Sequence, residues 1–121
     1  SNPRVVAHAH EWGRDTGISA GTAGNPLLVQ SGNYAVDNYP LDDKQRNVKS
    51  NRGAFVQKGD NLYLCIVKNA TVPDSGQVYK ALNADNAINI DGGGSSALWV
   101  NGSYKFGPGR NIPTAIIFAN R

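Results

Sequence analysis

The feature of this sequence best suited to chemistry is a run of small residues between two apolar stretches, Asp91-Gly92-Gly93-Gly94-Ser95-Ser96. Each glycine costs about 0.5–1 kcal/mol of backbone entropy relative to alanine. Such a run is justified where the chain turns at positive φ, or where a ligand approaches closer than a Cβ would allow. Successive N–H groups could then bind an anion, while Asp91 places a carboxylate at the mouth of a strand. The alternative is a tight turn that Asp91 caps.

Other reactive residue types are less informative. His8 and His10 have the spacing of two side chains on one face of a strand, but no third metal ligand stands out, and a solvated strand face is the preferred interpretation. Cys65 lies within the apolar run LYLCIV and is interpreted as a buried small residue rather than a nucleophile. No metal site and no cofactor are assigned. Ca²⁺ held by Asp91 and backbone carbonyls stays an alternative, although no EF-hand spacing is present.

Short strands are expected to position these residues. Each expected strand is an apolar or alternating run bounded by turn residues, and the runs cover residues 4–10, 26–30, 54–57, 62–67, 87–90, 97–100, 104–106 and 113–119. The run over 62–67 is nearly all apolar, which predicts a place at the centre of the sheet. Asn101-Gly102 predicts a tight hairpin turn.

One helix is predicted, beginning near Pro73 with Asp74 or Ser75 as N-cap and ending at residues 83–86. Its buried face is expected to contain the apolar residues at spacings of three and four, namely Val78, Leu82 and Tyr79. Residues 34–51 are polar and are predicted to form a long exposed loop. These elements together predict an α+β fold, a mostly antiparallel sheet with one main helix packed on it.

Length and composition exclude several classes of protein. The chain has 121 residues, the size of one domain, and its single cysteine excludes an internal disulfide. No apolar run approaches the ~18 residues of a membrane span, and the segment SNPRVV lacks the charged start and apolar stretch of a signal peptide. The net charge is 12 − 9 = +3, and the basic residues are scattered. We therefore expect no membrane span and no nucleic-acid partner.

Residues 86–102, NAINIDGGGSSALWVNG, closely resemble the signature of the phosphodiester glycosidase family. Three other segments are similar and follow in the family's order. AGNPLLVQSGN (23–33) resembles a Gly-x-Pro-Leu-Leu-Val segment, RGAFV (52–56) an Arg-x-Ala-hydrophobic-Gly strand, and GRNIP (109–113) an Arg-x-Val/Ile-Pro ending. Because family members carry a substantial upstream segment, we expect residues 1–121 to be a single phosphodiester-glycosidase-like domain that forms the C-terminal portion of a longer one.

The resemblance implies a hydrolase that cleaves the sugar–phosphate bond of an α-linked (N-acetyl)glucosamine-1-phosphodiester. It also favours a secreted, periplasmic or cell-surface location. A phosphomonoester leaves readily, so the reaction needs charge stabilisation on the phosphate and a carboxylate near the oxocarbenium-like carbon. Asp91 is expected to be that carboxylate, and Arg52 and Arg110 are expected to clamp phosphate oxygens. The remaining phosphate or substrate contacts are expected from Gly92, Gly93, Gly94, Ser95 and Ser96.

Alternatives stay open for several of these residues. Arg52 could be an exposed charge on an edge strand, and Arg110 could be an ordinary turn residue. Glu11 and Asp15 are the best candidates for a second carboxylate. Two other functions are also considered. The chain could be a non-catalytic module that binds a sugar phosphate or glycan, or a fragment that works only in association with an upstream segment of the same protein.

Overall fold

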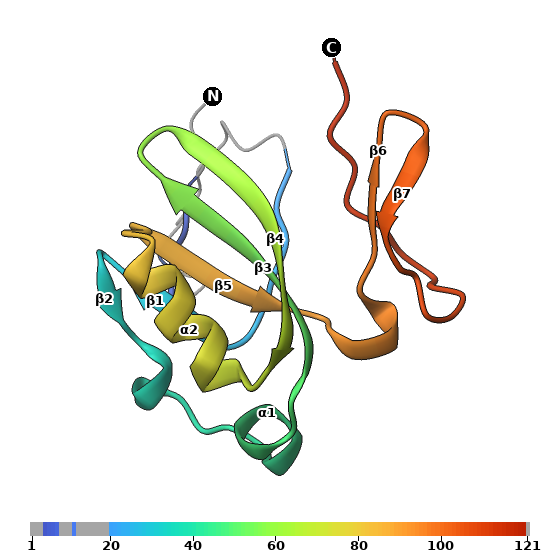
Figure 1. Cartoon of the computed structure of the whole chain (residues 1–121). Coiled ribbons are helices and arrows are strands. Elements are labelled where there is room, and N and C mark those ends of the chain that lie inside the picture. The colour runs from blue at the N-terminus through green and yellow to red at the C-terminus, as the bar shows by residue number, and fades with distance from the viewer. Residues whose placement is uncertain (1–3, 8–10, 12–19, 121) are drawn as a thin grey trace.

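The computed structural model describes residues 4–7, 11 and 20–120. Its largest unit is a five-stranded sheet in the order β2-β1-β5-β3-β4, in which every neighbouring pair is antiparallel. The strands are β1 (Leu27–Gln30), β2 (Asn33–Tyr34), β3 (Ser50–Lys58), β4 (Asn61–Ala70) and β5 (Asn86–Ile90). Helix α2 (Val72–Ala81) lies across one face of this sheet (Figure 1). The predicted α+β fold, with a mostly antiparallel sheet and one main helix, is confirmed.

The core lies between α2 and the sheet. Its largest fully buried side chains include Tyr79 of the helix and Leu28 and Val29 of β1. The helix can approach closely because Gly76 faces the core, where a Cβ would lie 2.8 Å from Val36 Cγ2. The predicted buried face of the helix is therefore only partly right. Tyr79 is buried, but Val78 and Leu82 are 38% and 60% exposed, because the buried face of the helix runs through Val72, Ser75, Gly76 and Tyr79.

The start of α2 also differs from the prediction. Thr71 is the N-cap, and its hydroxyl accepts a hydrogen bond from Asp74 N at 3.1 Å, while the Asp74 carboxylate accepts one from Thr71 N at 3.0 Å. Asp74 is thus the third residue of a capping box and not the cap itself. Hydrogen bonds to its carboxylate from the Thr71 backbone N–H and the Thr71 side chain lower the pKa of Asp74. The helix ends as predicted, with Asn83 at a φ of 59° just beyond its last turn.

Residues 34–51 do not form the long exposed loop that was predicted. They contain part of β2, the start of β3 and two short helical elements, η2 (Val36–Asn38) and α1 (Asp43–Asn47). A capping box begins α1, because the Asp42 side chain accepts from Gln45 N at 2.7 Å and Gln45 Oε1 accepts from Asp42 N at 3.3 Å. The predicted loop was based on the low apolar content of the segment. The Asp-x-x-Gln pattern, which begins a helix independently of apolar content, was not used.

Strand β4 carries the apolar run over 62–67, but it lies at an edge of the sheet and not at the centre. Its side chains contact protein on both faces. Cys65 and Val67 pack against the core under α2, whereas Leu64 and Ile66 line a small hollow beside the β5–β6 connection. Burial raises the pKa of the Cys65 thiol, in agreement with a packing role. The apolar run is thus half-buried at residues 64–67 and exposed at Leu62 and Tyr63, so its composition predicted more burial than an edge strand provides.

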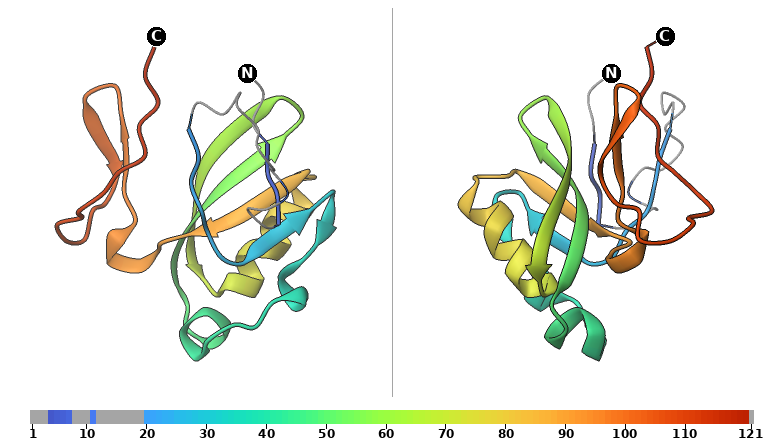
Figure 2. Two further views of the ribbon diagram at one scale, coloured as in Figure 1. Left: turned by 180° about the vertical axis from the view of Figure 1, so that it is seen from behind. Right: turned by 45° about the vertical axis from the view of Figure 1, so that its right-hand side comes forward.

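A separate two-stranded sheet consists of β6 (Leu98–Val100) and β7 (Ser103–Phe106). Its turn is the predicted one, with Asn101 at a φ of 49° and Gly102 at 87°, as a tight hairpin turn requires. Figures 1 and 2 show this hairpin set apart from the five-stranded sheet. The expected buried strand over 113–119 is wrong. It has no regular structure, and Ile117 and Phe118 are 80% and 63% exposed.

The remaining expectation for the fold concerns the N-terminal residues. A strand was predicted over residues 4–10, but residues 4–7 have no regular structure, and His8 and His10 lie outside the described residues. Within residues 4–7, 11 and 20–120, no helix is long and apolar enough to cross a membrane.

Candidate active site

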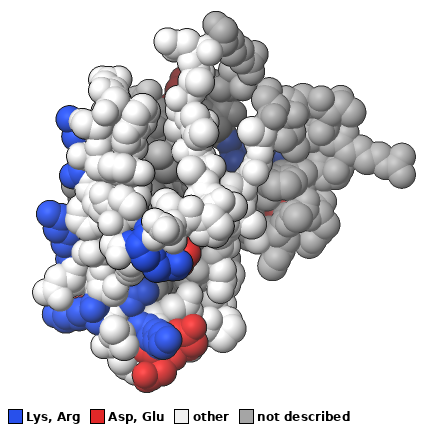
Figure 3. Space-filling model, turned by 90° about the vertical axis from the view of Figure 1, so that its right-hand side faces the viewer, with Lys and Arg blue, Asp and Glu red and all other residues white. Residues whose placement is uncertain are grey.

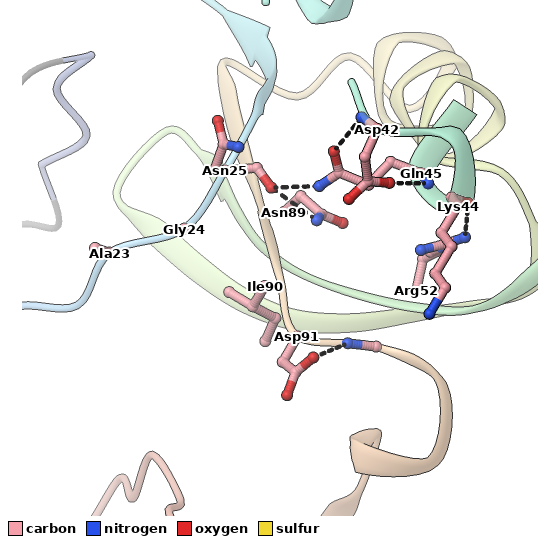
Figure 4. Close-up of a pocket in the computed structure, with 11 residues that line it drawn as sticks. Ala23, Gly24, Asn25, Asp42, Lys44, Gln45, Arg52, Asn89, Ile90 and Asp91 are labelled. Carbon is pink, nitrogen blue, oxygen red and sulfur yellow. Dashed lines mark hydrogen bonds between the residues drawn. The ribbon is translucent and has the colours of Figure 1, made fainter. Parts of the chain in front are cut away.

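A polar cleft of approximately 320 Å³ opens where β5 ends. Its walls come from the segment before β1, the start of α1, the first half of β3 and the end of β5 (Figure 4). The lining residues are Ala23, Gly24, Asn25, Asp42, Lys44, Gln45, Arg52, Asn89, Ile90, Asp91 and Gly92. The structure thus brings Asp91, Gly92 and Arg52, three of the residues predicted from the sequence, to one cleft.

Asp91 is the first residue after β5, and its side chain is exposed. Its Oδ1 accepts a hydrogen bond from Gly92 N at 3.0 Å (Figure 4). This contact holds the carboxylate at the mouth of the strand, where a reacting group would be needed. It is also the contact that a turn-capping role requires, so both interpretations of Asp91 are compatible with it.

The glycine run is shaped by its contact with β3. A Cβ on Gly92 would lie 2.6 Å from the backbone oxygen of Asn51, and Gly93 has a φ of 62°, which L side chains rarely adopt. The run then closes into η3 (Gly93–Ser95), in which Ser95 N donates to Gly92 O at 3.2 Å and Ser96 N to Gly93 O at 3.1 Å. Three backbone N–H groups of the motif therefore bond within the motif. An anion nest would use Gly93, Gly94 and the Ser95 hydroxyl, because the Ser96 hydroxyl is buried.

Arg110 lies against the glycine run. Its Nη2 donates to Ser95 Oγ, and a Cβ on Gly94 would be 3.6 Å from Arg110 Cδ. The neighbouring Gly109 N donates to Gly94 O at 3.1 Å. Arg110 does not line the cleft that contains Asp91 and Arg52. The predicted site residues thus form two groups, one in the cleft and one around η3, which are joined through Gly92.

Arg52 has a structural task in addition to its place in the cleft. Its Nε donates to Ala70 O at 3.1 Å, and its Nη2 donates to Lys44 O at 2.9 Å and Val48 O at 2.6 Å. The guanidinium therefore ties α1 to the end of β4. The alternative that Arg52 is an exposed charge on an edge strand is wrong, since β3 is an interior strand and the side chain is partly buried.

Substitution of Arg52 by Lys is expected to destabilise the protein. A lysine keeps the charge but has a single nitrogen, which cannot reach three carbonyls in the geometry of a guanidinium fork. Because a hydrogen bond from a charged group contributes about 1.5–3 kcal/mol, we expect a loss of about 2 kcal/mol in the free energy of unfolding, measured in urea. Arg46→Lys, on the exposed side of α1, is the matched control. Equal stability of the two variants would contradict the conclusion that the Arg52 hydrogen bonds stabilise the contact between α1 and β4.

Several cleft residues escaped the sequence analysis. Asp42 is the second carboxylate of the cleft, and Lys44 and Gln45 follow it from α1. The capping pattern Asp42-x-x-Gln45 is the signal that could have located this helix and its residues. Asn25 and Asn89 were also missed, and no sequence pattern singles them out among the asparagines of the chain.

Glu11 and Asp15 were the candidates for a second carboxylate. Glu11 is exposed and does not line it, and Asp15 lies outside the described residues. The part of the chain that the structure describes contains no group of three His, Cys, Asp or Glu side chains that could hold a metal ion.

The charges around the cleft are mixed. Asp42 and Asp91 supply two carboxylates, and Lys44 and Arg52 supply two cations. Figure 3 shows basic side chains spread over one face of the molecule, with acidic side chains beside them at the lower end, where α1 lies. A site of this kind can bind an anionic group through its cations while its carboxylates and amides contact hydroxyl groups.

Glycoside hydrolases usually use two carboxyl groups for catalysis. Neighbouring cations suit a substrate that carries a phosphate. The lining of the cleft is thus suited to a substrate that carries hydroxyl groups and a phosphate. Residues 1–119 match the model of the phosphodiester glycosidase family, and the chain belongs to this family. No curated protein sequence matches the chain significantly.

Two solved structures resemble the fold. The zebrafish N-acetylglucosamine-1-phosphodiester alpha-N-acetylglucosaminidase catalytic domain, auto-inhibited by its pro-peptide, is 24% identical, with a TM-score of 0.57 over 69% of this chain. A hypothetical protein from Synechocystis is 22% identical, with a TM-score of 0.55 over 66% of this chain. This chain covers 33% of the zebrafish chain and 17% of the Synechocystis chain. At these identities the likeness shows the fold alone.

Proposed function

We propose that this protein hydrolyses the sugar–phosphate bond of an α-linked N-acetylglucosamine-1-phosphodiester and releases free sugar and a phosphomonoester. The observation that carries the proposal is the presence of Asp91 and Arg52 in one cleft, with Lys44 as a second cation. Membership of the phosphodiester glycosidase family supports the reaction type. The substrate class is taken from the zebrafish relative, whose name specifies it.

In the proposed reaction the bond between the anomeric carbon and the phosphate oxygen breaks, and its electron pair leaves with the phosphate. Asp91 stabilises the positive charge that develops on the carbon and takes the proton of the attacking water. Lys44 and Arg52, which line the cleft, stabilise the negative charge of the leaving phosphate. Arg110, which lies beside η3, contributes to the same stabilisation. Since the phosphomonoester is a good leaving group, no strong general acid is required.

A second candidate function is supported by the hydrogen bonds inside the motif. Arg52 donates to backbone carbonyls, and the N–H groups of Gly92, Ser95 and Ser96 bond within the turn. These contacts are what a rigid binding module needs, so the same cleft could bind a sugar phosphate without cleaving it. Binding without turnover would distinguish this candidate from the hydrolase.

The test is release of free N-acetylglucosamine, measured by mass spectrometry, from an N-acetylglucosamine α-1-phosphodiester. If the gene encodes a longer protein, that full-length protein is used, because this chain covers only 33% of the zebrafish relative. Release by the full-length protein but not by residues 1–121 alone would support a site that needs an upstream segment. Absence of release, together with binding of N-acetylglucosamine 1-phosphate in calorimetry, would favour the binding module and contradict the hydrolase.

A further inference from the structure

One acceptor atom in the cleft is buried without a partner. Asn89 lies in β5 with 6% of its surface exposed, and its Nδ2 donates to Asn25 O at 2.9 Å. Its Oδ1 has no hydrogen-bond partner in the described part of the chain. Buried polar atoms in native proteins are almost always hydrogen-bonded, so an exception in a polar cleft indicates a bound ligand or water.

The orientation of this side chain is fixed by its neighbours. The Asn25 carbonyl can only accept a hydrogen bond, so the amide nitrogen of Asn89 must face it and the oxygen must face away. The backbones are also paired, with Asn25 N donating to Asn89 O and Asn89 N to Pro26 O, each at 3.0 Å. Figure 4 shows the Asn89 oxygen pointing away from Asn25 and towards the side of the cleft where Arg52 lies.

An uncharged acceptor oxygen repels phosphate oxygens and requires a donor. The cations of the cleft, Lys44 and Arg52, are suited to the phosphate, whereas the Asn89 oxygen is suited to a hydroxyl or amide N–H. Resting on the proposed function, we infer that Asn89 Oδ1 accepts a hydrogen bond from a hydroxyl or acetamido N–H of the substrate's sugar ring. Asn89 is thereby a specificity-determining residue of the sugar subsite.

The test compares substrates and variants of the full-length protein in one cycle. The substrates are the N-acetylglucosamine α-1-phosphodiester, its 2-hydroxy counterpart, and analogues that lack the donor at the 2, 3, 4 or 6 position of the ring. The variants are Asn89→Leu, which removes the acceptor, and Asn86→Leu as the matched control. Asn86 lies on the same strand outside the cleft, and both ends of its amide are hydrogen-bonded, to Ser31 N and Gln57 Oε1.

We expect the wild type to prefer the full substrate about 10- to 100-fold in kcat/KM over the analogue that lacks the relevant donor. The preference should vanish in Asn89→Leu and persist in Asn86→Leu. If the 2 position is the one that matters, equal rates for the acetamido and 2-hydroxy substrates identify a shared donor contact, and a difference identifies the acetamide. A preference that survives in Asn89→Leu, or a wild type without preference at any position, would overturn the inference.

Two further measurements distinguish failure of this inference from failure of the proposed function. The analogue series in the wild type does not depend on the folding of any variant. If the wild type releases no sugar, the same cycle is measured as the binding of the corresponding sugar 1-phosphates by calorimetry. A donor-dependent affinity that disappears in Asn89→Leu would then support the subsite although the hydrolase is refuted. Binding without this dependence, or no binding, would overturn it.

Discussion

Asp91→Asn is expected to lower kcat/KM for sugar release by about 10²- to 10⁴-fold, the range that a positioned acid–base group contributes. An amide can neither take up the proton of the attacking water nor stabilise positive charge on the anomeric carbon. The amide oxygen can still accept the hydrogen bond from Gly92 N, which the carboxylate accepts at 3.0 Å. Because the side chain is exposed, the free energy of unfolding should change by less than about 0.5 kcal/mol.

Comparison of Asp91→Asn with a control variant distinguishes a catalytic role of Asp91 from a role in capping the glycine turn. Asp60→Asn makes the same change at an exposed position in the turn between β3 and β4, outside the cleft, and should leave turnover as it is. Turnover is followed by mass spectrometry and stability by urea denaturation. If Asp91 only caps the glycine turn, asparagine will cap it equally well. Unchanged turnover in Asp91→Asn would therefore remove Asp91 from the mechanism.

Gly92→Ala is expected to impair both stability and turnover. The new Cβ would lie 2.6 Å from the backbone oxygen of Asn51, a position at which a backbone must move. Overpacking of this kind costs about 1–3 kcal/mol. The shift would displace Asp91 and the start of η3, and a displacement of about 1 Å in a catalytic group can cost about 10²-fold in rate.

Gly94→Ala is the matched comparison for stability. A Cβ on Gly94 would lie 3.6 Å from the Arg110 side chain, an ordinary contact with atoms that can move. We expect this variant to lose less than about 1 kcal/mol in the free energy of unfolding, since no backbone has to shift. Equal losses in the two alanine variants would show that close contact with β3 is not the reason for a glycine at position 92.

The sequence predicts the elements whose signals are local. The hairpin turn at Asn101-Gly102 is encoded by two adjacent residues, and the strands expected over 54–57 and 62–67 lie in β3 and β4, which pair with each other. The errors arise where tertiary contacts decide. The run over 62–67 lies in an edge strand with Leu62 and Tyr63 exposed, and the apolar residues Ile116, Ile117 and Phe118 are also exposed. Burial requires a covering element as well as hydrophobic side chains. Neither the position of a strand within the sheet nor the presence of a covering element can be inferred from the local pattern alone.

The candidate site was predicted only in part, since Asp91 and Arg52 were identified from the sequence whereas Asp42 and Asn89 were not. The motif at Asp91 was identified because consecutive glycines are costly and therefore informative, and Arg52 because it lies in a segment that resembles the family. Asp42 was missed because a capping side chain in a polar segment looks like any loop residue. Asn89 was missed because its importance depends on one unpaired oxygen, which only the three-dimensional structure reveals.

The short helix α1 has a consequence for how the cleft can open. A helix of five residues has little stability of its own, so it depends on its capping box and on hydrogen bonds to the rest of the protein, those from Arg52 among them. Asp42, Lys44 and Gln45 all depend on this one turn. We therefore expect this wall of the cleft to unfold locally at a lower free energy than the sheet. Any ligand that contacts this wall gains affinity only after the cost of ordering it, so occupancy of the cleft and order in α1 are thermodynamically linked.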